Sequence, residues 1–403
     1  MRRLLFSACM GTLACTPDPR PDAKRAPSKR AGPMPTALPM ERVPVAALAG
    51  AASPRLTPGP RGLTLSWLEP DGDATRLRAL PWGARTQPET VVRDATLLQN
   101  WADVPSVTAS NHGWIAAWPQ RTGAEHGYDL RWSRRDDHGV WSTAAAVSDA
   151  TQGPEFGFVS WAPAPDGTMS AFWLDGREST RSRGGAMQLW TGIVDGGGLR
   201  DRRVVDPRVC DCCQTAAAST PRGPVVAYRD RDDAEVRDIY VAGPDAGQRR
   251  RVGADDWRIE GCPVNGPAIA AQGQDLAVAW FSAADDRPRV RVAFASADAA
   301  FGEGIVVDDG TPLGRVDVVW LDASSVGVVW METVGKVAEL RLRRVRTDGS
   351  RAGTMRIATT ESSRRAGFPH LERDGAALAL TWVELEGNTS TIAAARAPIA
   401  GVL

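Results

Sequence analysis

The sequence predicts an all-β fold, a β-propeller of seven blades with four antiparallel strands in each blade. Two observations predict this fold. An alternating apolar run that ends in an aromatic residue recurs about every 50 residues, and short strands separated by turns flank each run. The length of 403 residues is also too great for one ordinary hydrophobic core and suits a repeat array. Six blades, with one repeat misread, is the alternative.

Seven aromatic residues anchor the repeat, at intervals of roughly 50 residues. Apolar residues stand two and four places before nearly every anchor, and this period of two is typical of a strand. Pro224 is the one awkward residue in these runs, because proline cannot donate a ladder hydrogen bond. The anchors are Trp67, Trp118, Trp173, Tyr228, Trp280, Trp330 and Trp382.

Each anchor strand has expected neighbours in the sequence. Pro267–Ala271 is a typical preceding strand, Arg289–Phe294 a typical following strand, and Gly304–Val307 a typical fourth strand. The last repeat stops after its third strand. We expect Val43–Leu48 to supply the missing outer strand, so that both ends of the chain share one blade. Such closure leaves no free sheet edge between the first and last blades.

The N-terminal segment, up to Cys15, has the pattern of an export signal. Two arginines precede the apolar stretch Leu4–Ala14, which is too short to span a bilayer. The sequence that ends at Cys15 resembles a lipobox, and this predicts lipidation of Cys15. An ordinary cleaved signal peptide is the alternative.

Residues 16–42 are proline-rich and charged, which predicts a disordered linker, and residues 43–403 form the predicted propeller. We therefore expect an exported protein in the cell envelope, facing the periplasm or the cell surface. Its membrane contact would be through the N-terminal lipid anchor only.

The charge balance argues against one class of partner. Lys+Arg and Asp+Glu are equal at 48 each, whereas a general nucleic-acid binder carries a basic excess. The sequence also contains no phosphate-binding or dinucleotide-binding loop motif. A carbohydrate, a small molecule or a protein remains as the expected ligand of the propeller mouth, and we expect a monomer.

The turn after the third strand carries an aspartate at a similar distance beyond the anchor in four repeats, at Asp137, Asp245, Asp298 and Asp348. Two of these turns, in Ser133–Trp141 and Ser296–Phe301, resemble the Asp-box Ser-x-Asp-x-Gly-x-x-Trp of the bacterial neuraminidase repeat, or sialidase-like, propellers. The resemblance implies the propeller architecture over residues 43–400, and in that family the box is a structural turn. It also brings sialidase activity into consideration, but the family's Phe/Tyr-Arg-Ile-Pro segment is absent here.

Four cysteines are expected at one rim of the propeller. Cys210 and Cys262 stand at the same distance before the anchors of their repeats, so they take equivalent places in adjacent blades, and Cys212 and Cys213 extend the group. In an exported protein the first expectation is two disulfides. A thiolate site for copper or zinc and a reactive, exchanging thiol are alternatives that the spacing leaves open.

A second predicted rim feature is acidic. Five of the seven residues that stand two places after an anchor are Asp or Glu, with arginines nearby. Such a ring could bind a sugar acid or supply paired carboxylates for acid–base chemistry, or it could simply end buried strands with ion pairs between blades. The candidate catalytic residues are Asp175, Arg177, Arg229, Asp230, Glu332, Glu384, Arg364 and Arg365.

Three functional hypotheses follow from the sequence. The first is an envelope-anchored propeller that binds a ligand or partner at its channel mouth. The second is a sialidase-like glycoside hydrolase of the exo-sialidase type, with rim carboxylates and arginines. The third is a periplasmic metal or redox protein that uses the cysteine cluster.

Overall fold

The computed structural model describes residues 35–123, 127–150, 155–179, 185–243, 249–296 and 299–402. These residues belong to one compact unit, Pro35–Leu403. The predicted signal, the predicted lipidation site Cys15 and the predicted linker up to residue 34 lie outside the described residues. So do Asp245 and Asp298 of the predicted turns.

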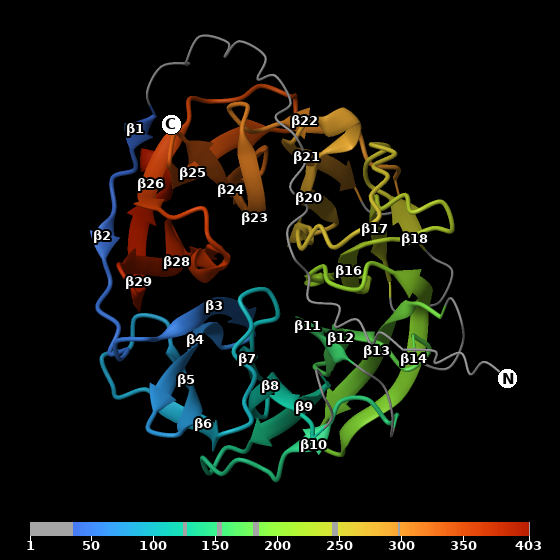
Figure 1. Cartoon of the computed structure of the whole chain (residues 1–403), viewed down its shortest axis with the longest axis vertical. Helices are drawn as coiled ribbons and strands as arrows, with labels where there is room; N and C mark the ends of the chain where they lie inside the picture. Colours follow the sequence, from blue (N-terminus) through green and yellow to red (C-terminus); the bar gives the residue numbers. More distant parts are fainter. Residues whose placement is uncertain are drawn as a thin grey trace, which may run out of the picture. The chain divides into compact units, whose positions relative to one another are not determined.

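Seven sheets of the described residues surround a central axis (Figure 1). Six have four strands and one has five, and within each blade consecutive strands pair antiparallel. The prediction of a seven-bladed, all-β propeller is therefore confirmed. The only helices of the described residues are three single 3-10 turns, η1 (Ala284–Asp286), η2 (Arg364–Ala366) and η3 (Ile399–Gly401). None of these is long and apolar enough to cross a membrane.

The first strand of each blade in the sequence is the innermost one. Blade 1 contains β3 (Ala52–Gly59), β4 (Gly62–Asp71), β5 (Ala74–Pro81) and β6 (Glu89–Asp94). Blade 2 contains β7 (Ser106–Ser110), β8 (Gly113–Arg121), β9 (Tyr128–Arg135) and β10 (Ala145–Ala146). Blade 3 contains β11 (Phe156–Pro163), β12 (Met169–Asp175), β13 (Met187–Asp195) and β14 (Gly198–Val209).

The remaining blades repeat this order. Blade 4 contains β15 (Ala216–Thr220), β16 (Gly223–Arg229), β17 (Ile239–Ala242) and β18 (Arg249–Arg251). Blade 5 contains β19 (Ala268–Gln272), β20 (Asp275–Ser282), β21 (Arg289–Ser296) and β22 (Ile305–Val306). Blade 6 contains β23 (Pro312–Asp322), β24 (Ser325–Val334), β25 (Val337–Arg346) and β26 (Met355–Thr360). Blade 7 contains β27 (His370–Asp374), β28 (Ala377–Glu386) and β29 (Thr389–Pro398).

Two short N-terminal strands complete the last two blades. β2 (Glu41–Arg42) pairs antiparallel with β29 as the outer strand of blade 7. β1 (Thr36–Ala37) pairs parallel with β26 and adds a fifth strand to blade 6. The N-terminal segment thus supplies the outer strand of the last blade, as expected, but the strand is Glu41–Arg42 and not Val43–Leu48. Pro44 explains the difference, because it has no N–H with which to continue the ladder beyond Val43.

The seven anchors all lie on the second strand of their blades, and each is at most 1% exposed. Each packs into a hydrophobic cluster with residues of a neighbouring blade. Trp173 contacts the cluster of Ile115 and Leu130 from blade 2, and Trp382 contacts Leu340 from blade 6. Burial of a large aromatic side chain at every junction is the packing that the repeat predicts.

Of the two Asp-box-like turns, Ser133–Trp141 is fully described, and it uses a different aspartate from the one predicted. In the first box the carboxylate of Asp136 accepts hydrogen bonds from the backbone N–H groups of His138 and Val140, at 3.0 and 2.8 Å. Asp137, the predicted residue, instead forms an exposed ion pair with Arg61 at 3.3 Å. In the sixth blade Asp348 accepts from Ser350 N at 2.8 Å, as expected for a structural turn.

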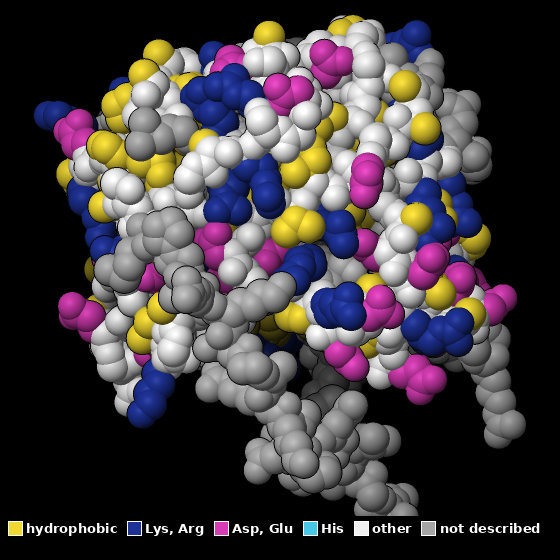
Figure 2. All heavy atoms as spheres, turned by 90° about the horizontal axis from the view of Figure 1, so that it is seen from above, with side chains coloured by type: hydrophobic (Ala, Val, Ile, Leu, Met, Phe, Trp, Pro, Cys, Tyr) yellow, Lys and Arg dark blue, Asp and Glu magenta, His cyan; other side chains and the backbone are white. Residues whose placement is uncertain are grey.

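The side of the propeller carries both charges. In the view of Figure 2, arginine side chains are interspersed with aspartate and glutamate over the described surface. This distribution matches the equal numbers of acidic and basic residues in the sequence.

Candidate functional site

A cavity of about 550 Å³ lies in the central channel. Its walls come from the inner strands of blades 1 and 3 to 7, and from the segment that precedes β7 in blade 2. Its volume is within the range of about 300–1,000 Å³ found for small-molecule sites. The cavity is therefore the main candidate site among the described residues.

Contacts between non-adjacent blades cross one end of the channel, the end at which the inner strands begin. Gln214 before β15 donates from Nε2 to the carbonyl of Ala102 before β7, at 3.0 Å. The ring of Trp101 stacks on Phe368 before β27, with centroids 5.7 Å apart. The guanidinium of Arg315 on β23 lies 4.9 Å from the Trp101 ring. These contacts close that end.

The opposite end of the cavity is open. The exposed lining residues Pro58, Pro60, Ser219 and Arg373 all lie near the ends of inner strands. This end is therefore the one at which the described lining of the cavity is exposed to solvent. This end lies opposite to the rim that carries the cysteines and the acids that follow the anchors.

A bulge recurs where the inner strands begin. Five inner segments have a residue with positive φ at a similar distance before the anchor, and three of these inner strands, β3, β11 and β23, also show a shift of register there. Such bulges bend the strand and re-aim the neighbouring side chains. The residues are Ser53 (φ 56°), Phe158 (57°), Val264 (46°), Arg315 (54°) and Gly367 (59°).

Asp103 holds one of these bulges from the neighbouring blade. Its Oδ1 accepts a hydrogen bond from Phe158 N at 2.8 Å. Gly157 is required beside it, because a Cβ there would lie 2.0 Å from Asp103 Oδ2. That Oδ2 is buried and has no hydrogen-bond partner among the described residues. The carboxylate thus presents an unpaired acceptor beside the cavity that it lines.

Four further charged residues line the cavity, namely Arg55, Asp317 and Glu372 and, at its open end, Arg373. Arg55 Nη1 donates to Val159 O at 3.3 Å, so the Arg55 side chain extends from blade 1 past blade 2 to blade 3. Asp317 accepts from Leu371 N and Val318 N, both at 2.9 Å, which fixes its carboxylate. The cavity therefore gathers three carboxyl groups around the guanidinium of Arg55, and Arg373 adds a second guanidinium at the open end.

Burial changes the protonation of these groups. It raises the pKa of Asp103 to about 7. It raises the pKa of Glu372 well above its usual range, and the neighbouring charge of Asp317 adds to this shift. Burial also lowers the pKa of Arg55, although the three carboxylates oppose this. Burial thus favours the protonated form of Glu372, in which it can donate a hydrogen bond.

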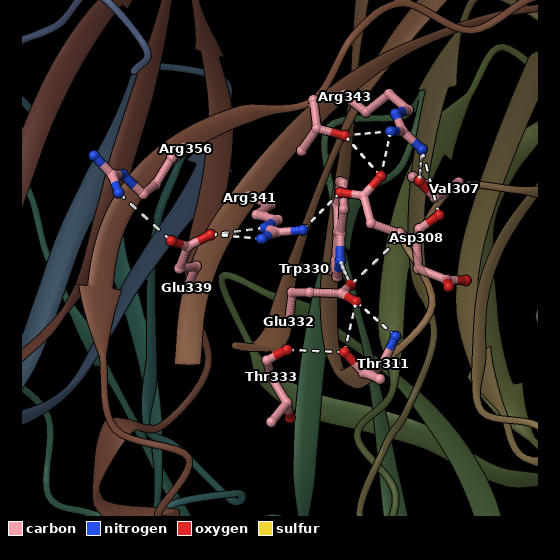
Figure 3. Close-up of polar contacts among 12 residues, drawn as sticks. Val307, Asp308, Thr311, Trp330, Glu332, Thr333, Glu339, Arg341, Arg343 and Arg356 are labelled. Atoms are coloured by element: carbon pink, nitrogen blue, oxygen red, sulfur yellow. Dashed lines mark hydrogen bonds and ion pairs between the residues drawn. The ribbon is translucent and has the colours of Figure 1, made fainter. Parts of the chain in front are cut away.

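The acids that follow the anchors lie between blades. Each acid stands two residues after its anchor, so the side chains of the acid and the anchor lie on the same face of the strand. The acid can therefore accept a hydrogen bond from the indole. Trp330 Nε1 donates to Glu332 at 2.6 Å, and Thr311 N donates to the same carboxylate at 2.6 Å (Figure 3). The indoles of Trp67, Trp118 and Trp173 donate in the same way to Glu69, Gln120 and Asp175.

The arginines near these acids are also engaged. Arg177 pairs with Asp175 at 2.8 Å and lies 3.7 Å from the Trp190 ring centre. Arg229, 2% exposed, donates to the carbonyls of Asn265, Arg237 and Phe281, which joins blades 4 and 5.

Asp230 and Glu384 have arginine partners as well. Asp230 accepts from Arg249 at 3.1 Å, and burial raises the pKa of Asp230 to about 6. Glu384 pairs with Arg42 of the closing strand β2.

Two predicted arginines lie near the closed end. Arg364 stands 5.7 Å from the Trp101 ring centre, and Arg365 donates to Gly387 O at 3.1 Å. None of the eight candidate catalytic residues is among the described residues that line the cavity.

The described residues contain one disulfide and not the two expected, and Cys212 and Cys262 are free. Cys210 and Cys213 form a disulfide, and Cys212 Sγ lies 4.0 Å from Cys210 Sγ. Cys212 donates a hydrogen bond to Cys262 from the next blade. The sulfurs of Cys210, Cys212 and Cys213 are close enough to share a metal ion, but two of them are joined to each other here.

The sequence reasoning missed the cavity residues. Arg55, Asp103, Asp317 and Glu372 all stand well before their anchors, inside the inner strands or just before them. A charged residue at such a place in an otherwise apolar run was the available signal, because a buried charge needs a specific reason.

No family model matches the chain, and no curated protein matches it. Solved structures do match. The polysaccharide lyase Uly1 is 8% identical with a TM-score of 0.50, over 92% of this chain and 91% of that one. The GH93 α-L-arabinofuranosidase of Fusarium graminearum is 12% identical with a TM-score of 0.48, over 88% and 94%. The Hadza microbial sialidase Hz136 is 13% identical with a TM-score of 0.45, over 85% and 78%.

The architecture agrees with the resemblance to the sialidase-like propellers. Identities this low show the fold alone. The residues that line the cavity of this chain are what indicates its candidate chemistry.

Proposed function

We propose that this chain is an envelope-anchored propeller that binds a small, hydroxyl-rich ligand bearing an amino group in its central cavity. The observation that carries the proposal is the group of three carboxyl residues, Asp103, Asp317 and Glu372, around the guanidinium of Arg55, with Arg373 at the open end. Glu372 is held toward its protonated form, but Asp103 and Asp317 still offer acceptor oxygens beside Arg55, so the ligand has to supply hydrogen-bond donors. An acidic sugar would bring further negative charge into this group and is disfavoured.

The shape and lining of the cavity support a sugar-sized ligand. Trp161 and Trp320 line it together with many small apolar residues. Their rings offer apolar area to the C–H faces of a sugar. The unpaired Oδ2 of Asp103 gains a partner only when a donor arrives, and a buried acceptor without a partner costs about 1–3 kcal/mol.

Calorimetry on the purified full chain tests this proposal. Amino sugars are titrated beside the neutral and the acidic sugars of the same ring size. We expect the amino sugars to bind most tightly, and Asp317→Asn to weaken that binding at least about tenfold, which corresponds to about 1.4 kcal/mol. Glu384→Gln, outside the cavity, is the matched control and should bind as the wild type does. Tightest binding of acidic sugars, or equal binding by Asp317→Asn, would contradict the proposal.

A second candidate function is glycoside hydrolysis in the same cavity. It is favoured by the neighbouring carboxyls Asp317 and Glu372, of which burial keeps Glu372 protonated. Acid–base catalysis at a glycosidic bond requires one carboxyl group that donates a proton and a second that accepts one. Glu372 would donate its proton to the leaving oxygen as the glycosidic bond breaks, and Asp317 would accept a proton from the water whose oxygen bonds to the sugar carbon. Release of fluorophore from a panel of aryl glycosides, sialosides included, tests this second function. Turnover by the wild type that is lost in Glu372→Gln supports hydrolysis. The absence of turnover by the wild type on every glycoside of the panel contradicts it.

The envelope anchor is the remaining part of the proposal. It is supported by the apolar stretch and the lipobox-like sequence that ends at Cys15, outside the described residues. Palmitate labelling in cells should mark the wild type, and Cys15→Ser should abolish both the label and membrane fractionation. A labelled Cys15→Ser variant would contradict the anchor.

A further inference from the structure

The sulfur cluster, Cys210, Cys212, Cys213 and Cys262, lies at the closed end of the channel, away from the cavity opening. The backbone places it there. Cys210 follows β14 directly, and its N–H donates to Arg229 O at 3.0 Å. Cys262 precedes β19 of the next blade. The cluster therefore joins two blades at a face that the proposed ligand does not use.

The four sulfurs differ in how far a solvent molecule can reach them. Cys210 and Cys213 are buried, at 1% and 2% exposure, and are joined as a disulfide. Cys212 is half-buried, and Cys262 is exposed. The order from solvent inward is thus Cys262, Cys212 and then the disulfide. An external reactant meets Cys262 first.

The surroundings of Cys262 favour its thiolate. The hydrogen bond donated by the Cys212 thiol lowers the pKa of Cys262 to about 7, and the guanidinium of Arg237 acts in the same direction. Burial and the carboxylates of Asp211 and Glu155 oppose the shift. The same hydrogen bond and burial raise the pKa of Cys212, so Cys212 remains the thiol of the pair. An exposed thiolate beside a protonated thiol is the arrangement of an attacking and a resolving cysteine.

We propose that Cys262 and Cys212 form a redox-active dithiol that reduces external disulfides at the closed face of the propeller. The Cys262 thiolate attacks one sulfur of the external disulfide and expels the other as a thiolate, which leaves a mixed disulfide on Cys262. Cys212 then loses its proton and attacks Cys262 Sγ, which expels the second thiolate. The products are two external thiols and a Cys212–Cys262 disulfide between blades 4 and 5. Two electrons pass from the dithiol to the external disulfide.

The buried Cys210–Cys213 disulfide has a positioning role in this reaction. It closes a short loop that contains Cys212, so Cys212 Sγ is held 4.0 Å from Cys210 Sγ, in a position from which its thiol donates to Cys262. Arg237 reinforces the loop, because its Nη1 lies 3.5 Å from Cys210 Sγ while its Nη2 donates to Glu235 at 2.8 Å. Neither buried sulfur is accessible to an external disulfide.

Mass spectrometry of the full chain with oxidised glutathione tests the proposal. The protein is treated with a mild thiol reductant and desalted without oxygen. The wild type should consume one oxidised glutathione, release two reduced glutathiones and gain a Cys212–Cys262 bond with no adduct. Cys212→Ser should stop at a mixed disulfide on Cys262 and release one glutathione. Cys262→Ser should react at least about tenfold more slowly, because an ordinary thiol is only a few per cent thiolate at neutral pH.

Other results would overturn the proposal. One is an adduct that forms on Cys212 as fast in Cys262→Ser as in the wild type. Another is a Cys210–Cys213 bond that opens before Cys212–Cys262 under the mild reductant. A third is a reduced protein that retains one zinc or copper ion and fails to react until a chelator removes the ion. Because Cys262 is exposed, its serine variant is expected to keep the fold, and its thermal unfolding curve serves as the check.

Discussion

At the scale of single residues, buried carboxylates of this propeller fall into two kinds. Glu332 is saturated, since an indole, a backbone N–H and a hydroxyl all donate to it. Asp103 has one donor, at Oδ1, and its other oxygen is unpaired among the described residues. A saturated carboxylate stabilises the blade junction, whereas an unsaturated one is available to a ligand. This difference separates the acids that follow the anchors from the acids of the cavity.

Removal of Glu332 should destabilise the fold. In Glu332→Ala the indole N–H of Trp330 and the N–H of Thr311 lose their acceptor in a buried site, and we expect a loss of about 3 kcal/mol in the free energy of unfolding. Urea denaturation of the full chain measures it. Glu384→Ala is the control at the equivalent place in blade 7. Its carboxylate is 39% exposed and pairs with Arg42, so the loss should be only about 0.5 kcal/mol. Equal losses in both variants would contradict this account.

Asp103 should make stability depend on pH. Its pKa is raised to about 7 in the folded protein, whereas an unfolded aspartate has a pKa near 4. Between these values the unfolded state has fewer protons, so stability falls as pH rises from about 4 through 7. At about 1.4 kcal/mol per pKa unit, the stability lost when the buried Asp103 carboxyl ionises is roughly 4 kcal/mol. Asp103→Asn keeps an acceptor for Phe158 N, but its side chain does not ionise and so makes no pH-dependent contribution to stability.

Denaturation of both proteins at pH 5 and pH 8 checks that prediction. The wild type should lose more free energy of unfolding than Asp103→Asn over this interval, because only the wild type has to ionise the buried carboxyl of Asp103, whereas Asp230 and Glu372 are present in both proteins. The same loss in both proteins would show that Asp103 ionises as freely in the fold as in the unfolded chain.

At the scale of elements, the closing segment should contribute strongly to stability for its length. Leu38 is 4% exposed in the cluster of blades 6 and 7, and Leu38 N donates to Arg356 O at 2.8 Å. A chain that begins at Val43 lacks this contact and both edge strands, and should lose about 3 kcal/mol relative to a chain that begins at Pro35. Amide hydrogen exchange should quicken in β29 and β26. Unchanged protection of these two strands would contradict the closing role.

Strands and anchors of this fold were predictable because their signal is local. A period of two and an aromatic residue in every repeat depend only on which side chains face the junction. The closing strand was placed too late, because Val45 and Ala47 are apolar for a different reason. They pack against the core of blade 1 after Pro44 has ended the ladder. The cysteine convergence was also predictable, since equal distances from two anchors define equivalent places in adjacent blades.

The cavity was not predictable in the same way. Arg55 and Asp317 stand at the edges of bulges, where the regular pairing of their inner strands ends, and Asp103 precedes its strand, so strand periodicity alone does not tell which side chain faces the channel. Which end of the channel is open depends on contacts between blades that are not neighbours. Such pairs, like Trp101 with Phe368, have no pattern in a single sequence.

At the scale of the whole molecule, the contacts across the closed end should stiffen the ring. Trp101 connects blade 2 to Phe368 before β27 and to Arg315 of blade 6. Trp101→Ala removes these contacts together, and we expect faster amide exchange in β23 and β27 as well as in β7. Trp114→Ala is the matched control, because Trp114 is a tryptophan of blade 2 whose cation partner, Arg135, is in the same blade. Amide exchange that quickens only in blade 2 for both variants would contradict the bracing role. The contacts between adjacent blades would then be sufficient to stiffen the ring.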